Sequence, residues 1–160
     1  MSASTRLLAA LGLLLILTVP AFAATIRVPA DQPTIQAGIN AAVDGDTVLV
    51  APGTYYESLW YGFSGEDLVL RSEAGTESTV IAAEDEGITF QSGESPAAEV
   101  DGFTIRNGWL EHTGGAGIRI LNSSPTIKKV VVRDCTALSG YRDIYGGGMV
   151  ISGGSPLVVN

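Results

Sequence analysis

The chain of 160 residues contains one cysteine, one histidine and few basic side chains. A single cysteine cannot form an internal disulfide, and we interpret Cys135 as a small packing residue rather than a reactive thiol. Any Ser-His-Asp arrangement would depend on His112 alone, and no nucleophile-elbow motif surrounds a serine. Nine Lys and Arg against 17 Asp and Glu give a formal net charge of −8. We therefore expect no binding to nucleic acid or anionic lipid.

Residues 1–23 have the pattern of a secretory signal peptide. Arg6 precedes the almost wholly apolar residues 7–19, and residues 21–23 (AFA) form a small-x-small cleavage site. The apolar run is short for a membrane span of about 20 residues, although an uncleaved anchor is the alternative. We expect a bacterial protein that is secreted or held at the cell surface, with no membrane span after cleavage.

Sustained helical spacing is also scarce, and one segment has it. In residues 33–43 the apolar positions stand four apart: Ile35, Ile39 and Val43. Pro33 suits the first helical position, with Asp31 or Gln32 as the cap, and residues 44–46 (DGD) end the helix. We expect this amphipathic helix to cover the apolar end of an all-strand fold.

Glycine and β-branched residues are abundant, and they form a sequence pattern that repeats along the chain. Residues 103–107 (FTIRN) recur 27 positions later as 130–134 (VVVRD), and residues 117–120 (GIRI) recur 31 positions later as 148–151 (GMVI). A period of roughly 20–50 residues indicates a solenoid, and apolar alternation within each repeat indicates short strands. The fold class we predict is all-β: a parallel β-helix, with each strand about 4.8 Å from its counterpart in the next coil.

The remaining segments fit the same single domain, residues 24–160. Five further strands are expected at 25–28, 47–50, 67–71, 78–82 and 87–90, with residues 51–54 as a turn. The last residues of the sequence have a pattern typical of a strand, and no pattern typical of a capping segment follows. We therefore expect further coils after Asn160.

Two stretches carry a resemblance to a known superfamily. Residues 26–57 contain the elements TIQA, GDTVLV and PGTYYE, and residues 100–108 read VDGFTIRNG. With them, nearly all of residues 24–160 resembles secreted proteins of the pectin-lyase-like superfamily, whose pectin methylesterases have a similar opening. The resemblance implies a right-handed coil and an extracellular polysaccharide as substrate or ligand.

Candidate catalytic residues follow from the same resemblance. In the lyases an Arg or Lys removes a uronate proton while calcium, held by acidic side chains, stabilises the charge. Arg106 and Arg133 occupy matching outward positions in two coils and are our candidates, with a solvated arginine ladder as the alternative. Residues 84–86 (EDE) offer oxygens for calcium, but their spacing favours a solvated turn, so we assign no metal site.

Other catalytic motifs are missing from the sequence. The polygalacturonase segments Gly-His-Gly and Arg-Ile-Lys are not found, and the methylesterase likeness stops before its catalytic residues. The glycine runs at 114–117 and 146–148 are not phosphate loops, because neither leads into a helix with a lysine.

Aromatic side chains cluster in residues 55–61, where sugar rings could stack. Tyr56, Trp60 and Tyr61 are the carbohydrate-binding candidates, whereas packing of Tyr55 and Trp60 under the helix is the alternative. We expect a monomer that binds or cleaves extracellular polysaccharide, pectate-lyase-like, or meets another cell-surface component. A non-catalytic structural or adhesive role is the alternative. Whether the protein is an enzyme stays open. If it is, we expect a polysaccharide (pectate) lyase that uses calcium. We do not expect the 160 residues alone to be catalytically active.

Overall fold

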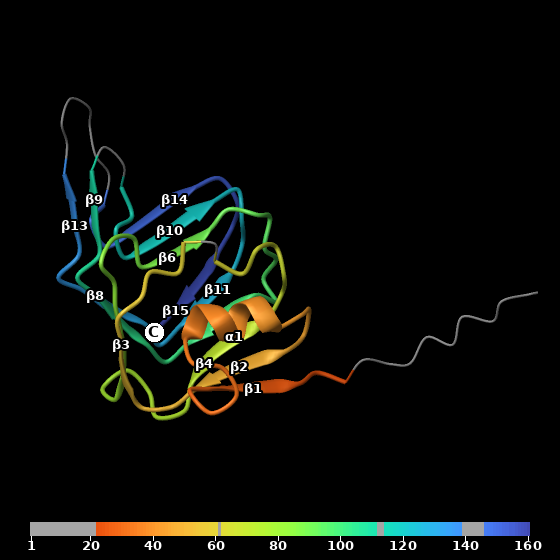
Figure 1. Cartoon of the computed structure of the whole chain (residues 1–160). Coiled ribbons are helices and arrows are strands. Elements are labelled where there is room, and N and C mark those ends of the chain that lie inside the picture. Colours follow the sequence, from red (N-terminus) through yellow and green to blue (C-terminus); the bar gives the residue numbers. More distant parts are fainter. Residues whose placement is uncertain (1–21, 61, 112–113, 139–145) are drawn as a thin grey trace, which may run out of the picture.

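The computed structural model describes residues 22–60, 62–111, 114–138 and 146–160. The signal peptide expected at residues 1–23 therefore lies almost wholly outside the described residues, and so do Tyr61 and His112. Figure 1 shows the described part as strands wound into successive coils, with one short helix against the first of them.

The strands form four sheets in which every pairing is parallel. Sheet A contains β1 (Thr25–Val28), β2 (Thr47–Val50), β4 (Val69–Ser72), β7 (Glu99–Asp101), β11 (Thr126–Lys128) and β15 (Leu157–Val159), in that order. Sheet B contains β3 (Gly53–Tyr55), β5 (Thr79–Ala82), β8 (Thr104–Arg106) and β12 (Val131–Arg133). Sheet C contains β6 (Ile88–Phe90), β10 (Ile118–Leu121) and β14 (Met149–Ser152), and sheet D contains β9 (Trp109–Glu111) and β13 (Thr136–Leu138). The predicted parallel β-helix is confirmed, whereas its right-handed sense stays a prediction.

The strand register preserves the repeat read from the sequence. Arg106 pairs with Arg133, and Ile118 pairs with Met149, so the offsets of 27 and 31 both correspond to one coil. The four extra residues of the second offset lie between β13 and β14, a connection that includes residues 139–145, which are outside the described part of the chain. One loop per coil therefore changes in length while the strands stay in register.

Alternating side chains fill the interior of the coil. From sheet A the buried row is Val48, Leu70, Val100 and Ile127; Ile81 and Ile105 come from sheet B, and Ile88 and Ile118 from sheet C. Phe63 and Phe90 meet edge to face inside it, with ring centroids 5.1 Å apart. This continuous apolar column is the hydrophobic core, and the outward residues between its members form the surface rows.

Helix α1 (Ile35–Ala41) is shorter than the sequence predicted. Its cap is Thr34, whose side chain accepts from the Ala37 N–H, so the prediction of Asp31 or Gln32 was wrong. The Asp31 carboxylate instead accepts from the Arg27 N–H. Pro33 therefore precedes the cap rather than opening the helix.

The expected burial of Val43 was also wrong. Ala42 is already extended, with φ −82° and ψ 157°, so Val43 lies beyond the helix and is exposed. The helix instead packs through Gly38, where a Cβ would lie 2.9 Å from a Val48 methyl and 3.0 Å from a Val28 methyl. The helix contacts β1 and β2, and its predicted capping role stays a prediction.

Four strands escaped the sequence analysis: β3, β7, β9 and β13. The turn expected at residues 51–54 is partly wrong, because β3 begins at Gly53. Strands β9 and β13 were not expected at all; they pair with each other and project beside the main coil in Figure 1. Each is three residues long, too short for alternation to be recognisable.

Candidate functional site

The predicted arginine pair lies on the outer face of sheet B. Arg106 has Arg133 as its register partner on one side and Ala82 on the other. Tyr56 directly follows Tyr55, whose partner is the residue before Ala82, so it continues the same line. Tyr56, Ala82, Arg106 and Arg133 form what we call the Arg106 row. The adjacency of the two arginines is confirmed.

The two arginines of this row differ in their partners. The Arg133 guanidinium pairs with the Asp134 carboxylate at 2.7 Å, so its charge is largely offset. Arg106 makes no ion pair within the described residues, and its buried Nε has no hydrogen-bond partner. The following residues, Asn107 and Asp134, both have positive φ (65° and 56°), which gives the two coils the same turn. The uncompensated cation of the row is therefore Arg106.

The predicted aromatic cluster is divided between two sites. Tyr56 is 72% exposed at the end of the Arg106 row. Trp60 is 49% exposed but belongs to another face, beside sheet C, so packing of Trp60 under the helix was wrong. Tyr55 packs against the core, and its hydroxyl donates to the Ala51 carbonyl at 2.9 Å. Burial raises the pKa of Tyr55, and the Glu57 charge adds to the effect.

The acidic turn at residues 84–86 is not uniformly solvated. Glu84 and Asp85 are exposed, but Glu86 is only 8% exposed, and its carboxylate lies 3.6 Å from the Arg119 guanidinium. The solvated interpretation was therefore wrong for Glu86. Within the described residues no three His, Cys, Asp or Glu side chains come together in a way that could hold a metal ion. The side chains present do not fit calcium, and we derive no step through it.

Cys135 is a partly buried thiol at the junction of β12 and β13. Burial raises its pKa, the Gly108 backbone opposes this, and the Asp134 charge adds to the rise. The thiol donates weakly to the Arg133 carbonyl at 3.4 Å. Because the thiolate is disfavoured, the side chain suits packing better than nucleophilic chemistry.

Sequence reasoning missed three polar residues near sheet C. Thr89 and Arg119 are register partners, and Glu86 reaches Arg119 from the turn before β6. Arg119 stood outward between two apolar residues, and Glu86 was interpreted as part of a solvated turn. The similarity of residues 87–90 (GITF) to residues 117–120 (GIRI) could have revealed the pairing of β6 with β10, but it was overlooked.

Comparison with protein-family models, curated proteins and solved structures found no match for this chain. The fold alone is therefore established: a parallel β-solenoid of about 4 turns. No helix in the described part of the chain has the length and apolar character needed to span a bilayer.

Proposed function

We propose that this β-solenoid is exported, as its N-terminal text indicates, and binds an acidic extracellular polysaccharide through the Arg106 row. The observation that carries this proposal is the unpaired Arg106 guanidinium in line with the exposed Tyr56 ring. A guanidinium binds a carboxylate in two-pronged geometry, and an aromatic face binds the apolar face of a sugar ring. A uronate chain presents both groups at every residue.

The spacing of the row fits a short stretch of polysaccharide. Successive strands lie about 4.8 Å apart, so Tyr56 and Arg106, with Ala82 between them, stand about 10 Å apart along the solenoid axis. Ala82 is small and buried, so it adds no projecting side chain between Tyr56 and Arg106. A chain lying along the axis could place one ring on Tyr56 and the carboxylate of a neighbouring ring on Arg106.

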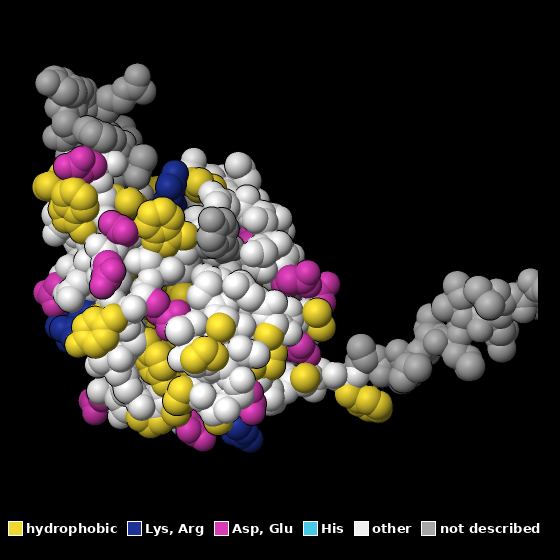
Figure 2. Space-filling model, in the orientation of Figure 1, with side chains coloured by type: hydrophobic (Ala, Val, Ile, Leu, Met, Phe, Trp, Pro, Cys, Tyr) yellow, Lys and Arg dark blue, Asp and Glu magenta, His cyan; other side chains and the backbone are white. Residues whose placement is uncertain are grey.

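Acidic side chains outnumber basic ones on the face in Figure 2, in keeping with the net charge of −8. The attraction must therefore be local to Arg106 rather than a property of the whole surface. We expect modest affinity that falls as salt screens the pair.

Binding fits the site better than cleavage. A lyase needs a base near the uronate C5 and a cation to stabilise the carboxylate as charge develops. Arg106 could hold the carboxylate, but the described residues offer no cluster that could place a metal ion beside it. Membership of the pectin-lyase-like superfamily, which the sequence resembles, is part of the same proposal.

A structural or adhesive role is the second candidate, and the outer face of sheet A favours it. There Glu99 receives both Arg71 at 3.2 Å and Lys128 at 2.5 Å, while Arg71 also reaches Asp101 at 3.3 Å. These pairs connect three successive coils from outside, as a rigid spacer requires.

The test is calorimetric titration of the secreted full chain with polygalacturonate and alginate, at low and high salt. We expect binding that weakens about tenfold or more in Arg106→Gln or Tyr56→Ala, since a charged pair or an aromatic contact is lost. Arg27→Gln, an exposed cation outside the row, should bind as the wild type does. No binding by a folded wild type would overturn the proposal and favour the structural role.

A parallel ultraviolet assay for unsaturated uronide, with calcium and with chelator, separates binding from cleavage. We expect no product in either condition. Calcium-dependent product that disappears in Arg106→Gln and Arg133→Gln would contradict a binding-only role and make the protein a lyase.

A further inference from the structure

A second row of outward side chains lies on the face of sheet C. Leu59 bridges to Ile88, and Trp60 follows it in a turn that brings Gly62 onto Thr89, where a Gly62 Cβ would lie 1.8 Å from the Thr89 carbonyl oxygen. Thr89 pairs with Arg119, and Arg119 pairs with Val150. We call Trp60, Thr89, Arg119 and Val150 the Trp60 row. It shares no residue with the Arg106 row.

Two buried oxygens beside this row have unused hydrogen-bonding capacity. Thr89 is 2% exposed, and its hydroxyl has no partner. The Glu86 Oε1 is likewise enclosed and makes no hydrogen bond, because the nearest Arg119 nitrogen is 3.6 Å away. Buried polar atoms are nearly always satisfied, by protein, by water or by a ligand. Thr89 and Glu86 are both neighbours of Arg119, so the two oxygens offer hydrogen-bonding positions on either side of one residue.

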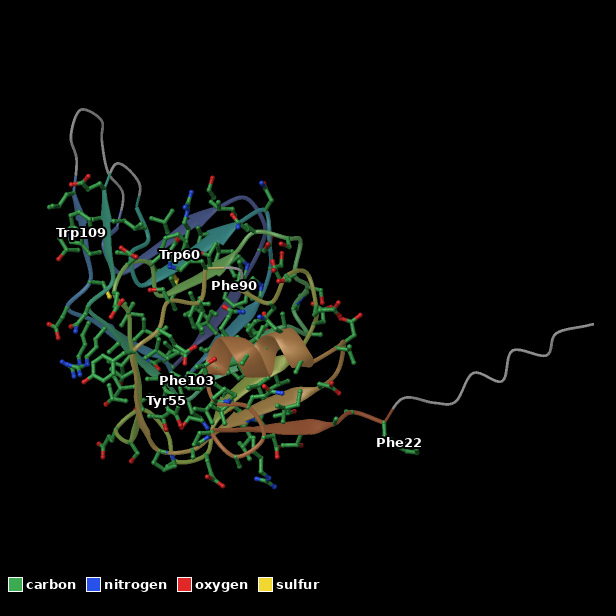
Figure 3. All side chains as sticks on the ribbon, in the orientation of Figure 1. Phe22, Tyr55, Trp60, Phe90, Phe103 and Trp109 are labelled. Carbon is green, nitrogen blue, oxygen red and sulfur yellow. The ribbon has the colours of Figure 1, made fainter. Side chains whose placement is uncertain are left out.

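The surroundings show where such a group would enter. At one end of the row a turn lies close over the strands, since a Cβ at Gly115 would be 3.1 Å from the Arg119 Cβ and 3.2 Å from the Val150 Cβ. At the other end Trp60 is half exposed, and Figure 3 shows it on the coil near Phe90. Thr89 is enclosed between Gly62, two residues after Trp60, and Arg119. The movable side of this enclosure is Arg119, whose side chain is 26% exposed and held by a loose ion pair.

We propose that the Trp60 row is a binding site for a neutral sugar. The pyranose ring stacks on the Trp60 indole, and its hydroxyls take the unused positions on Thr89 Oγ1 and Glu86 Oε1 as Arg119 turns outward. The site provides a hydroxyl, an acceptor-only carboxylate and an aromatic face, which match the donors and the apolar face of a sugar.

The charges of Glu86 and Arg119 disfavour charged ligands at the Trp60 row. Glu86 and Arg119 cancel each other, so the site has no net attraction for an ion. A uronate or phosphate placed on Trp60 would meet the Glu86 carboxylate, whereas a metal ion at Glu86 would meet the Arg119 guanidinium. A neutral polyhydroxyl ligand meets neither repulsion. This inference does not depend on the Arg106 row.

The experiment is calorimetric titration of the full chain with cellohexaose, xylohexaose and mannohexaose, with polygalacturonate as the acidic comparison. We expect one or more of the neutral hexasaccharides to bind, and the affinity to fall about tenfold or more in Trp60→Ala. Trp60→Phe should retain part of it. Thr89→Val, which keeps the shape and removes the hydroxyl, should lose about fivefold.

The matched control is Trp109→Ala, which removes the other exposed tryptophan, on β9 away from the row. It should leave neutral-sugar affinity unchanged, and Trp60→Ala should leave polygalacturonate affinity unchanged. Absence of binding to all three hexasaccharides would overturn the inference. So would equal losses in the two tryptophan variants, or an unchanged affinity in Thr89→Val. If the wild type binds a neutral hexasaccharide but not polygalacturonate, the proposal for the Arg106 row is refuted and the proposal for the Trp60 row is supported.

Discussion

The inner coils and the last described coil have similar sequences, but their inward side chains are buried to very different extents. Ile120 is 0% exposed, while its register partner Ile151 is 49% exposed. Ile127 is 2% exposed, while its partner Val158 is 52% exposed. Sequence and register are alike in each pair, so local propensity does not cause the difference. In a solenoid, a coil is buried by its neighbours rather than by its own residues.

In the first coil, Val28 is as buried as the residues of the inner coils, but for a different reason. Val28 on β1 is buried although no coil precedes it among the described residues, because helix α1 packs on it through Gly38. At Val28 the helix therefore makes a contact of the kind that a neighbouring coil makes elsewhere, in keeping with the predicted capping role. The largest effects of substitution should accordingly lie between coils and the smallest on the last one.

The residue before each sheet C strand offers the sharpest version of this comparison. Gly87, Gly117 and Gly148 occupy equivalent positions before β6, β10 and β14. A Cβ at Gly87 would lie 2.2 Å from the Gly117 carbonyl oxygen, whereas at Gly148 the nearest atom is 3.8 Å away. We expect Gly87→Ala to lower the free energy of unfolding by about 3 kcal/mol and Gly148→Ala by less than about 0.5 kcal/mol. Urea unfolding measures both, and equal losses would mean that the coils are not closely stacked.

The attachment of the helix at the other end gives a smaller effect. The Glu57 carboxylate accepts from the Ile35 and Gln36 N–H groups, both at 2.9 Å, so it satisfies two free donors of the first turn. We expect Glu57→Ala to cost about 1–2 kcal/mol of unfolding free energy. Glu77→Ala, which removes an exposed carboxylate on a loop, is the control and should cost little. If Glu57→Ala leaves the free energy of unfolding unchanged, the hydrogen bonds from Glu57 to the first turn of the helix do not stabilise the fold.

The outer ladder of sheet A gives a smaller, pH-dependent effect. Partial burial raises the pKa of Glu99, but hydrogen bonds from Lys128 and Arg71 outweigh this and leave the pKa below its usual value. The ion pairs therefore stabilise the fold above the ordinary carboxyl pKa of about 4.3, and this stability is lost as pH falls through the lower folded pKa.

Solvent screening keeps the expected contribution of Glu99 to about 0.5–1 kcal/mol. Glu99→Gln should be less stable than the wild type by this amount at pH 7, and the difference should shrink as the pH is lowered through the folded pKa of Glu99, as measured by urea unfolding across this range. The last coil provides an internal contrast, because Leu157 stands in line with Glu99 and carries no charge. A stability difference that does not change with pH would refute the ion-pair account.

The sequence predicted those features that repeat from coil to coil. The offset of 27 residues was enough to place Arg106 beside Arg133, because strand register follows the repeat. The ion pair between Glu86 and Arg119 was missed, because Glu86 lies in the turn before β6 rather than at a repeated strand position.

The helix boundary was missed for a different reason. Spacing alone favoured residues 33–43, but the Thr34 side chain caps the helix by accepting from the Ala37 N–H, and Ala42 turns extended, so both ends lie inside that range. Hydrogen bonding at the ends, rather than apolar period, decides where a short helix stops.

The most direct test of the stacked-coil account uses the chain of residues 1–160, in which no coil covers Ile151. It compares the unfolding free energy of Ile120→Ala with that of its register partner, Ile151→Ala. The two positions share residue type, sheet and direction, and differ in burial. The account predicts a loss of about 2–5 kcal/mol for Ile120→Ala, because a cavity is left between coils, and less than about 0.5 kcal/mol for Ile151→Ala. Equal losses at the two positions would contradict it.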